Sequence, residues 1–185
     1  GLGQLGTQFS RSLAEAGARV ALYSRRPFSD AQLAEKFPGL TDRIKVHEAS
    51  VTDKAALAAA TDALIADWGV PHVLVNNAGI DSKPSGSAEQ NAPFEVYPQK
   101  YWDEIIDVNL TGVMLTSQAV GSKMAEKGRG SIINIGSIYG MVSPNQALYA
   151  YREARDGVPF VKAVSYAASK SGLVNLSRYL ATYWA

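Results

Sequence analysis

The chain has 185 residues, a length that suits one domain with a sizeable core. Hydrophobic residues make up 46% and charged residues 19%, a balance that excludes wholesale disorder. Because 18 basic residues stand against 17 acidic ones, no overall field would draw the chain to nucleic acid or to a membrane surface. We therefore expect a small-molecule partner. The lack of cysteine excludes disulfides and thiolate metal sites and fits a reducing compartment, the cytoplasm by default.

The first half of the chain alternates helical and strand patterns. Phe9 and Leu13 share one face of a short amphipathic helix that Gly17 would end. Compact apolar runs bounded by polar residues predict strands that are buried on both faces, and Thr52 or Asp53 can cap the next helix. The predicted elements are a helix over 7–16, strands over 20–23 and 44–46, a helix from 53 to 68 and a strand over 72–75.

The second half repeats the alternation after a proline-containing surface excursion over 80–98. A long helix is predicted over about 99–127, a buried strand over 131–135 and a second long helix over 162–184. Strands separated by helices imply parallel pairing through right-handed crossovers. The predicted fold class is therefore α/β, a three-layer Rossmann-like doubly wound parallel sheet whose ligands bind at the carboxyl ends of the strands. We expect residues 1–185 to form a single domain.

Glycines precede the first predicted helix. The run from Gly1 to Gly6 would let backbone amides approach a pyrophosphate while the helix dipole favours its charge. Three glycines before a helix also make ordinary turns, so this pattern alone leaves both interpretations open.

The predicted strand over 20–23 is followed by Ser24, Arg25 and Arg26. At this place many dinucleotide-binding folds have an acid that accepts hydrogen bonds from the adenosine ribose. A serine followed by arginines instead suits a ribose 2′-phosphate, because guanidinium makes charge-assisted bonds with phosphate oxygens. This favours NADP(H) over NAD(H). Two solvated arginines after an ordinary strand are the alternative.

A phenol and an amine stand four residues apart at Tyr166 and Lys170, so on a helix both side chains share one face. Three further segments accompany them in a fixed order. They are Asn76-Asn77-Ala78-Gly79 after a strand, Asp107-Val108-Asn109-Leu110 within the long helix, and Gly136-Ser137 at the end of the next strand. With these motifs the chain resembles a classical short-chain dehydrogenase/reductase over essentially its whole length.

The resemblance implies a catalytic tetrad of Asn109, Ser137, Tyr166 and Lys170. Tyr166 would be the acid and base, Ser137 would bind the carbonyl or hydroxyl oxygen, and Lys170 would bind the nicotinamide ribose and stabilise the phenolate. Asn109 would hold a water that connects Lys170 to solvent. Neither histidine belongs to a Ser-His-Asp arrangement, and the chemistry needs no metal. The expected cofactor-binding residues are Gly1, Gln4, Leu5, Gly6, Ser24, Arg25, Ser50, Val51, Asn77, Ala78, Gly79, Tyr166 and Lys170.

The chain also departs from the family's pattern. Gln4 occupies a position usually filled by glycine, and Ser50 stands where the family's adenine-side aspartate is expected. The domain is expected to be incomplete, lacking the family's first strand and its carboxyl-terminal region. Residues 138–165 form an insertion that would lie near the substrate mouth. Its Arg152 and Arg155 either face an anionic or sugar-like substrate or are solvated surface charges.

These features predict an NAD(P)-dependent oxidoreductase that interconverts a secondary alcohol and a ketone. A sugar acid or another polyhydroxylated compound is the expected substrate, and a 3-ketoacyl or xenobiotic ketone is the alternative. Two other classes remain open: a nucleotide-binding member without turnover, and a sugar-nucleotide epimerase that uses a similar Tyr and Lys. The resemblance also implies a homotetramer in the cytoplasm, with the long helices from 99 and 162 at its interface.

Overall fold

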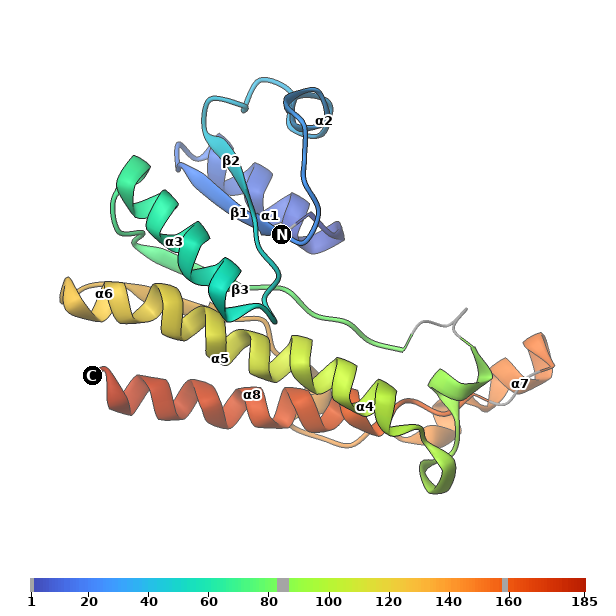
Figure 1. Ribbon diagram of the computed structural model, residues 1–185. Helices are drawn as coiled ribbons and strands as arrows, with labels where there is room; N and C mark the ends of the chain where they lie inside the picture. The colour runs from blue at the N-terminus through green and yellow to red at the C-terminus, as the bar shows by residue number, and fades with distance from the viewer. Residues whose placement is uncertain (1, 83–86, 158–159) are drawn as a thin grey trace. The chain divides into compact units, whose positions relative to one another are not determined.

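A computed structural model describes residues 2–82, 87–157 and 160–185 (Figure 1). These residues form two compact units, which we treat separately. The first unit holds the residues up to Ala78 together with Leu115–Ile133, and the second holds Gly79–Met114 and Asn134–Ala185. None of the described helices is both long enough and apolar enough to cross a membrane.

The first unit contains the alternating helices and strands of the amino-terminal half. Strands β1 and β2 pair in parallel, with Val20 opposite Ile44 and Ser24 opposite Glu48. β3 pairs with β4 in a second two-stranded sheet. The elements are α1 (Gln4–Glu15), β1 (Val20–Ser24), α2 (Asp30–Lys36), β2 (Ile44–Glu48), α3 (Lys54–Trp68), β3 (Val73–Asn76) and β4 (Ser131–Asn134). This alternation confirms the predicted α/β, Rossmann-like fold class, with the described strands arranged as two pairs.

Local signals explain where these helices begin and end. Asp53, rather than Thr52, caps α3, and its side chain accepts a hydrogen bond from the backbone N–H of Ala56. Gly17 follows α1 at φ 95°, a conformation that costs glycine little and other residues more. Two apolar clusters form the core of the unit. The first comprises Ala14, Leu22, Phe37 and Ile44, and the second comprises Ala49, Leu57 and Ala60.

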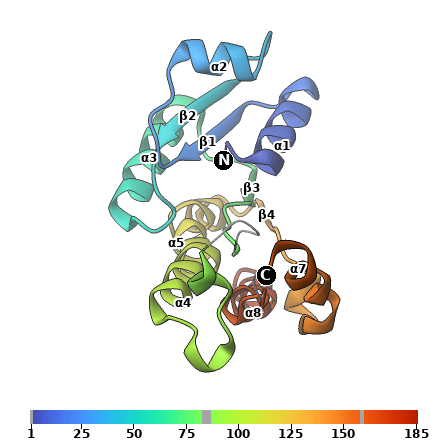
Figure 2. The same ribbon diagram turned by 90° about the vertical axis from the view of Figure 1, so that its right-hand side faces the viewer.

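The second unit is dominated by long helices (Figure 2). The predicted helix over 99–127 is confirmed as α4 (Gln99–Ile106), α5 (Gly112–Thr116) and α6 (Ser122–Glu126), joined by the π-helical turns η3 (Asp107–Thr111) and η4 (Ser117–Gly121). Of these, α4 and η3 belong to the second unit, whereas η4 and α6 belong to the first. The predicted helix over 162–184 is confirmed as α8 (Val164–Tyr183), which packs against α4. Shorter elements complete the unit: η1 (Ala88–Asn91), η2 (Phe94–Val96), η5 (Ile138–Gly140), η6 (Gln146–Tyr149) and α7 (Ala150–Asp156).

Candidate functional site

Helix α8 carries Tyr166 and Lys170 one turn apart. The Nζ atom of Lys170 lies 5.8 Å from the centroid of the Tyr166 ring and donates a hydrogen bond of 2.7 Å to the carbonyl oxygen of Ile135. Burial lowers the pKa of Lys170, and the nearby charge of Asp81 opposes that shift. The Tyr166 hydroxyl makes no hydrogen bond to the described residues, so it is available to a ligand.

Asn109 lies in the π-helical turn η3 and is completely buried. Its Oδ1 accepts a hydrogen bond from the Ile80 N–H at 2.8 Å, and its Nδ2 donates to the Ile80 carbonyl at 2.8 Å. The same Nδ2 donates to Ser169 Oγ on α8 at 3.2 Å. Both N–H groups of the amide are thus engaged by protein, which leaves only one lone pair of Oδ1 for the water that the resemblance implies.

Ser137 follows β4 and caps the short turn η5. Its Oγ accepts a hydrogen bond of 3.2 Å from the Tyr139 N–H, and its own hydroxyl hydrogen has no acceptor within the described part of the chain. The turn packs on α8, where Ser171 Oγ donates to the Gly140 carbonyl at 3.2 Å. All four expected tetrad members therefore lie in the second unit, around the amino-terminal half of α8.

The glycine-rich entry leads directly into α1. Gly3 is the N-cap residue and provides no side-chain hydrogen bond, so the first backbone N–H groups of this 12-residue helix are left to other acceptors. Gln4 and Leu5 are exposed, whereas Gly6 is buried. Gly1 lies outside the described residues. The geometry fits an anion at the start of α1.

Arg25 is exposed at the end of β1 and pairs with none of the residues that the structure describes. Ser24 Oγ accepts a hydrogen bond from the Arg26 N–H at 3.3 Å. After β2, Ser50 Oγ bonds the Thr52 hydroxyl at 2.9 Å, and Val51 is half-buried beside it. An unpaired arginine suits a phosphate ligand and a solvated charge equally well.

Asn76, the last residue of β3, has a structural role. Asn76 is buried, and its Nδ2 donates to Ser117 Oγ at 3.3 Å, which links β3 to η4. Asn77 and Ala78 are half-buried, and Gly79 is exposed at the start of the second unit. The expected cofactor residues thus fall into two sets. Gly79, Tyr166 and Lys170 belong to the second unit and the others to the first.

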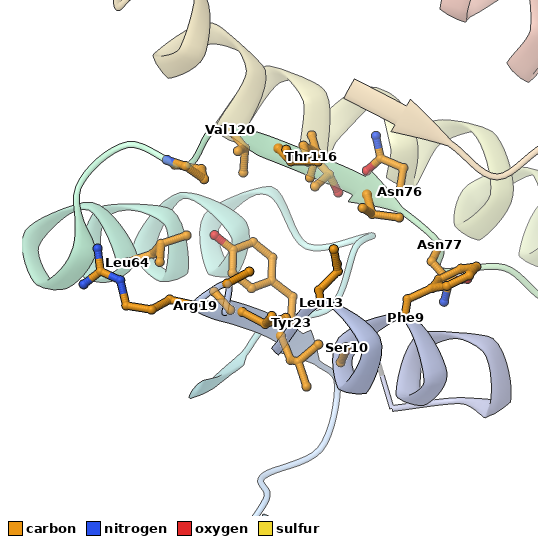
Figure 3. A pocket seen from close by; sticks show the side chains of 18 of the residues that line it. Phe9, Ser10, Leu13, Arg19, Tyr23, Leu64, Asn76, Asn77, Thr116 and Val120 are labelled. Carbon is orange, nitrogen blue, oxygen red and sulfur yellow. The ribbon is translucent and has the colours of Figure 1, made fainter. Parts of the chain in front are cut away.

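A cavity of about 480 Å³ opens in the first unit (Figure 3). Phe9 and Leu13 of α1, Tyr23 of β1 and Leu64 of α3 lie around it. None of the tetrad lines it, but four of the expected cofactor residues do: Gly6, Val51, Asn77 and Ala78. The backbones of β1 and β3 also line this cavity, although these two strands belong to different sheets.

Sequence reasoning missed an ion pair beside Tyr166. The Lys162 ammonium pairs with the Asp81 carboxylate, and the two residues are 81 positions apart. Lys162 precedes Tyr166 by four residues, a helical spacing, but it lies before α8 begins at Val164. No local pattern in the sequence marks Asp81 as its partner.

The insertion arginines bond within the insertion itself. Arg152 is buried rather than solvated, with its guanidinium carbon 4.1 Å from the Phe160 ring centroid and its NH2 group 3.6 Å from the Asp156 carboxylate. Arg155 is exposed and pairs with the same carboxylate at 2.6 Å. Both arginines therefore stabilise α7 rather than stand free.

Comparison with known proteins assigns the chain to a family. The sequence model of the short chain dehydrogenase family matches residues 1–185. The chain belongs to the short-chain dehydrogenase family. It is 31% identical over 180 residues to a D-threitol dehydrogenase of Mycolicibacterium smegmatis, covering 97% of this chain and 60% of that protein. It is also 31% identical over 182 residues to a gluconate 5-dehydrogenase of Gluconobacter oxydans, covering 97% of this chain and 61% of the relative.

A solved structure agrees with this assignment. The crystal structure of a gluconate 5-dehydrogenase from Burkholderia cenocepacia, in complex with NADP and tartrate, superimposes with a TM-score of 0.78 at 29% identity. The match covers 98% of this chain and 62% of that one. The chain thus spans about three fifths of the length of these relatives.

Proposed function

We propose that this chain carries the catalytic centre of an NADP(H)-preferring oxidoreductase that interconverts a secondary alcohol and a ketone. The observation that carries the proposal is the arrangement on α8, where the Tyr166 hydroxyl has no hydrogen-bond partner among the described residues and the Lys170 ammonium lies within 5.8 Å of its ring. A phenol free to bond a ligand, with a buried cation beside it, suits proton transfer to or from a substrate oxygen.

Each tetrad residue has a task that its contacts permit. Tyr166 would give its proton to the developing alkoxide in reduction and take it back in oxidation. Ser137 would donate its unused hydroxyl hydrogen to the same substrate oxygen and so orient it. Lys170 would stabilise the tyrosinate by its charge, and its hydrogen bond to Ile135 holds the ammonium in place. Asn109 would maintain the site by tying Ile80 to α8.

The described residues fit a nicotinamide dinucleotide. When bound, the cofactor would supply or accept the hydride. The uncapped start of α1 would hold its pyrophosphate, and the unpaired Arg25 would hold a ribose 2′-phosphate. Lys170 retains two N–H donors beyond its bond to Ile135 and would bond the nicotinamide ribose. Asn77, Ala78 and Gly79 would also contact the cofactor.

A polyhydroxylated alcohol or a sugar acid is the substrate class that we propose. The names of the relatives support this, since one acts on D-threitol and another on gluconate. A 3-ketoacyl or xenobiotic ketone is the alternative, because the same tetrad serves both and the fold alone does not choose between them.

We further propose that residues 1–185 are the greater part of one dinucleotide-binding and catalytic domain. The cavity of about 480 Å³ lies against both β1 and β3, so an added apolar strand there would join the two sheets. Homotetramer assembly and a cytoplasmic location stay predictions.

The test begins with fluorescence titration of NADPH and NADH. It would use this chain and a version extended at both ends with the corresponding segments of a relative. NADPH preference in the extended protein supports the proposal. A folded extended protein that binds neither nucleotide would point to a member without turnover, and nucleotide retained through purification would point to an epimerase.

Tyr166→Phe tests the chemistry directly. The substitution removes the proton donor and little volume, so turnover should fall by about 100-fold or more while cofactor affinity changes little. Tyr179→Phe, at an exposed position of the same helix, is the matched control. Retained turnover in Tyr166→Phe would contradict the assigned role.

A further inference from the structure

The Asp81–Lys162 pair lies against the tyrosine to which we assign proton transfer. The Lys162 Nζ atom is 4.8 Å from the centroid of the Tyr166 ring and 5.9 Å from that of Tyr139. It is closer to the Tyr166 ring than Lys170 is, at 5.8 Å. The Lys162 ammonium therefore lies beside the phenol to which we assign proton transfer.

Lys162 is held more firmly than a surface lysine. Its side chain is only 11% exposed, although a lysine in water keeps many rotamers. The side-chain amide of Gln146, also in the insertion, makes two hydrogen bonds to the Lys162 backbone. The Lys162 N–H donates to Gln146 Oε1 at 2.9 Å, and Gln146 Nε2 donates to the Lys162 carbonyl at 3.2 Å. These two hydrogen bonds restrict the position of the Lys162 backbone.

The Asp81 carboxylate has two partners. One carboxylate oxygen accepts the Ser82 N–H at 2.8 Å, and the other accepts the Lys162 ammonium. Burial raises the pKa of Tyr97, and the charge of Asp81 adds to that shift. Burial lowers the pKa of Lys170, and the charge of Asp81 opposes that shift. The Asp81 carboxylate therefore influences the titration of both Tyr97 and Lys170.

The pair retains unused hydrogen-bonding capacity. An ammonium has three N–H donors, and the only acceptor of Lys162 among the described residues is Asp81. The carboxylate keeps lone pairs of its own. Lys162 and Gln146 also line a cavity of about 250 Å³, so the lysine borders space that a ligand group could occupy.

We propose that Asp81 and Lys162 determine substrate specificity by binding a hydroxyl group on the carbon next to the reacting one. A hydroxyl both donates and accepts, so it matches a carboxylate and an ammonium that stand side by side. An alkyl substituent at that place would cover a charged pair without replacing its hydrogen bonds, which is unfavourable. This inference rests on the proposed function and narrows its substrate class to compounds with vicinal hydroxyls.

The experiment compares substrates that differ by that one hydroxyl. The probes are butane-2,3-diol against butan-2-ol, and trans-cyclohexane-1,2-diol against cyclohexanol, each oxidised with NADP⁺. The wild-type protein should prefer the diol of each pair. In the double variant D81N/K162M, which removes both charges together, the ratio of diol to alcohol kcat/KM should fall by about 10-fold or more.

A second variant and a matched control guard against simple structural damage. Gln146→Ala leaves both charges in place but releases the Lys162 backbone, and it should lower the same ratio to a smaller degree. Lys100 and Glu89 form an exposed ion pair in the same unit, with N and O 2.6 Å apart, and E89Q/K100M should leave the ratio unchanged. Circular dichroism melting would report the stability of each variant.

The outcomes are distinct. An equal loss on both members of each probe pair, or an unchanged ratio in a folded D81N/K162M, would show that the ion pair is structural and would overturn this inference alone. Wild-type preference for the simple alcohols would also overturn it, with the proposed function intact. No oxidation of any of the four probes, or of D-threitol and gluconate, would count against both.

Discussion

Gly140 gives the sharpest test of how closely the serine-bearing turn fits α8. A Cβ atom added at Gly140 would lie 2.7 Å from the carbonyl oxygen of Lys170 and 2.9 Å from its carbonyl carbon. Carbon and oxygen atoms ordinarily stay at least ~3.3 Å apart, so one backbone segment would have to move by about 0.6 Å. The atoms that the Cβ would meet first belong to the backbone of Lys170, so no flexible side chain can absorb the displacement.

The expected result of Gly140→Ala is a net loss of stability. Overpacking costs about 1–3 kcal/mol, and the reduced freedom of the unfolded chain returns about 0.4–1 kcal/mol. We therefore expect a loss of about 1–2 kcal/mol, seen as a fall in Tm of about 2–8 °C for a chain of this size. Ser137 caps the displaced turn, so kcat should fall by more than the loss of folded protein alone would explain.

Gly136→Ala is the matched control, four residues before Gly140 and just ahead of the turn η5. A Cβ atom at Gly136 would meet nothing within 4 Å, so this variant should be as stable as the wild type or slightly more stable. Urea unfolding of both variants measures the difference. If Gly140→Ala proved as stable as Gly136→Ala, the close approach of η5 to α8 would be refuted.

Three further predictions concern other parts of the chain. Arg25→Ala should weaken NADPH binding by about 10-fold and NADH binding much less, because a charge-assisted bond to the 2′-phosphate is lost; equal losses in the titration would remove Arg25 from that role. Asn109→Ala should cost about 2–4 kcal/mol in urea unfolding, since it removes three buried hydrogen bonds, whereas the exposed Asn175→Ala should change stability by less than about 0.5 kcal/mol. Burial and the charge of Lys45 lower the pKa of His47, so the unfolded state binds a proton more readily than the folded state. The free energy of unfolding should therefore fall as the pH drops below about 6.5. His47→Gln should flatten that pH dependence.

Much of the fold followed from local patterns. Helical periodicity and compact apolar runs predicted α1, β1, β2, α3, β3, β4 and the two long helices with ends that differ from the observed ones by a few residues. Such patterns succeed because hydrogen bonding within a helix and burial of one face depend mainly on neighbours in sequence. The π-helical turns were not predicted, since one extra residue in a helical turn leaves little trace in periodicity.

The candidate site likewise combines features that local sequence determines with features that only packing determines. The sequence by itself determined that Tyr166 and Lys170 share a helix face, because the spacing of four residues on α8 is local. Only the tertiary structure decided that Asn109 bonds Ile80 and that Asp81 pairs with Lys162. Those partners lie 29 and 81 residues apart along the chain. The packing of whole elements selects such partners, and no short-range pattern encodes which buried polar groups must satisfy one another.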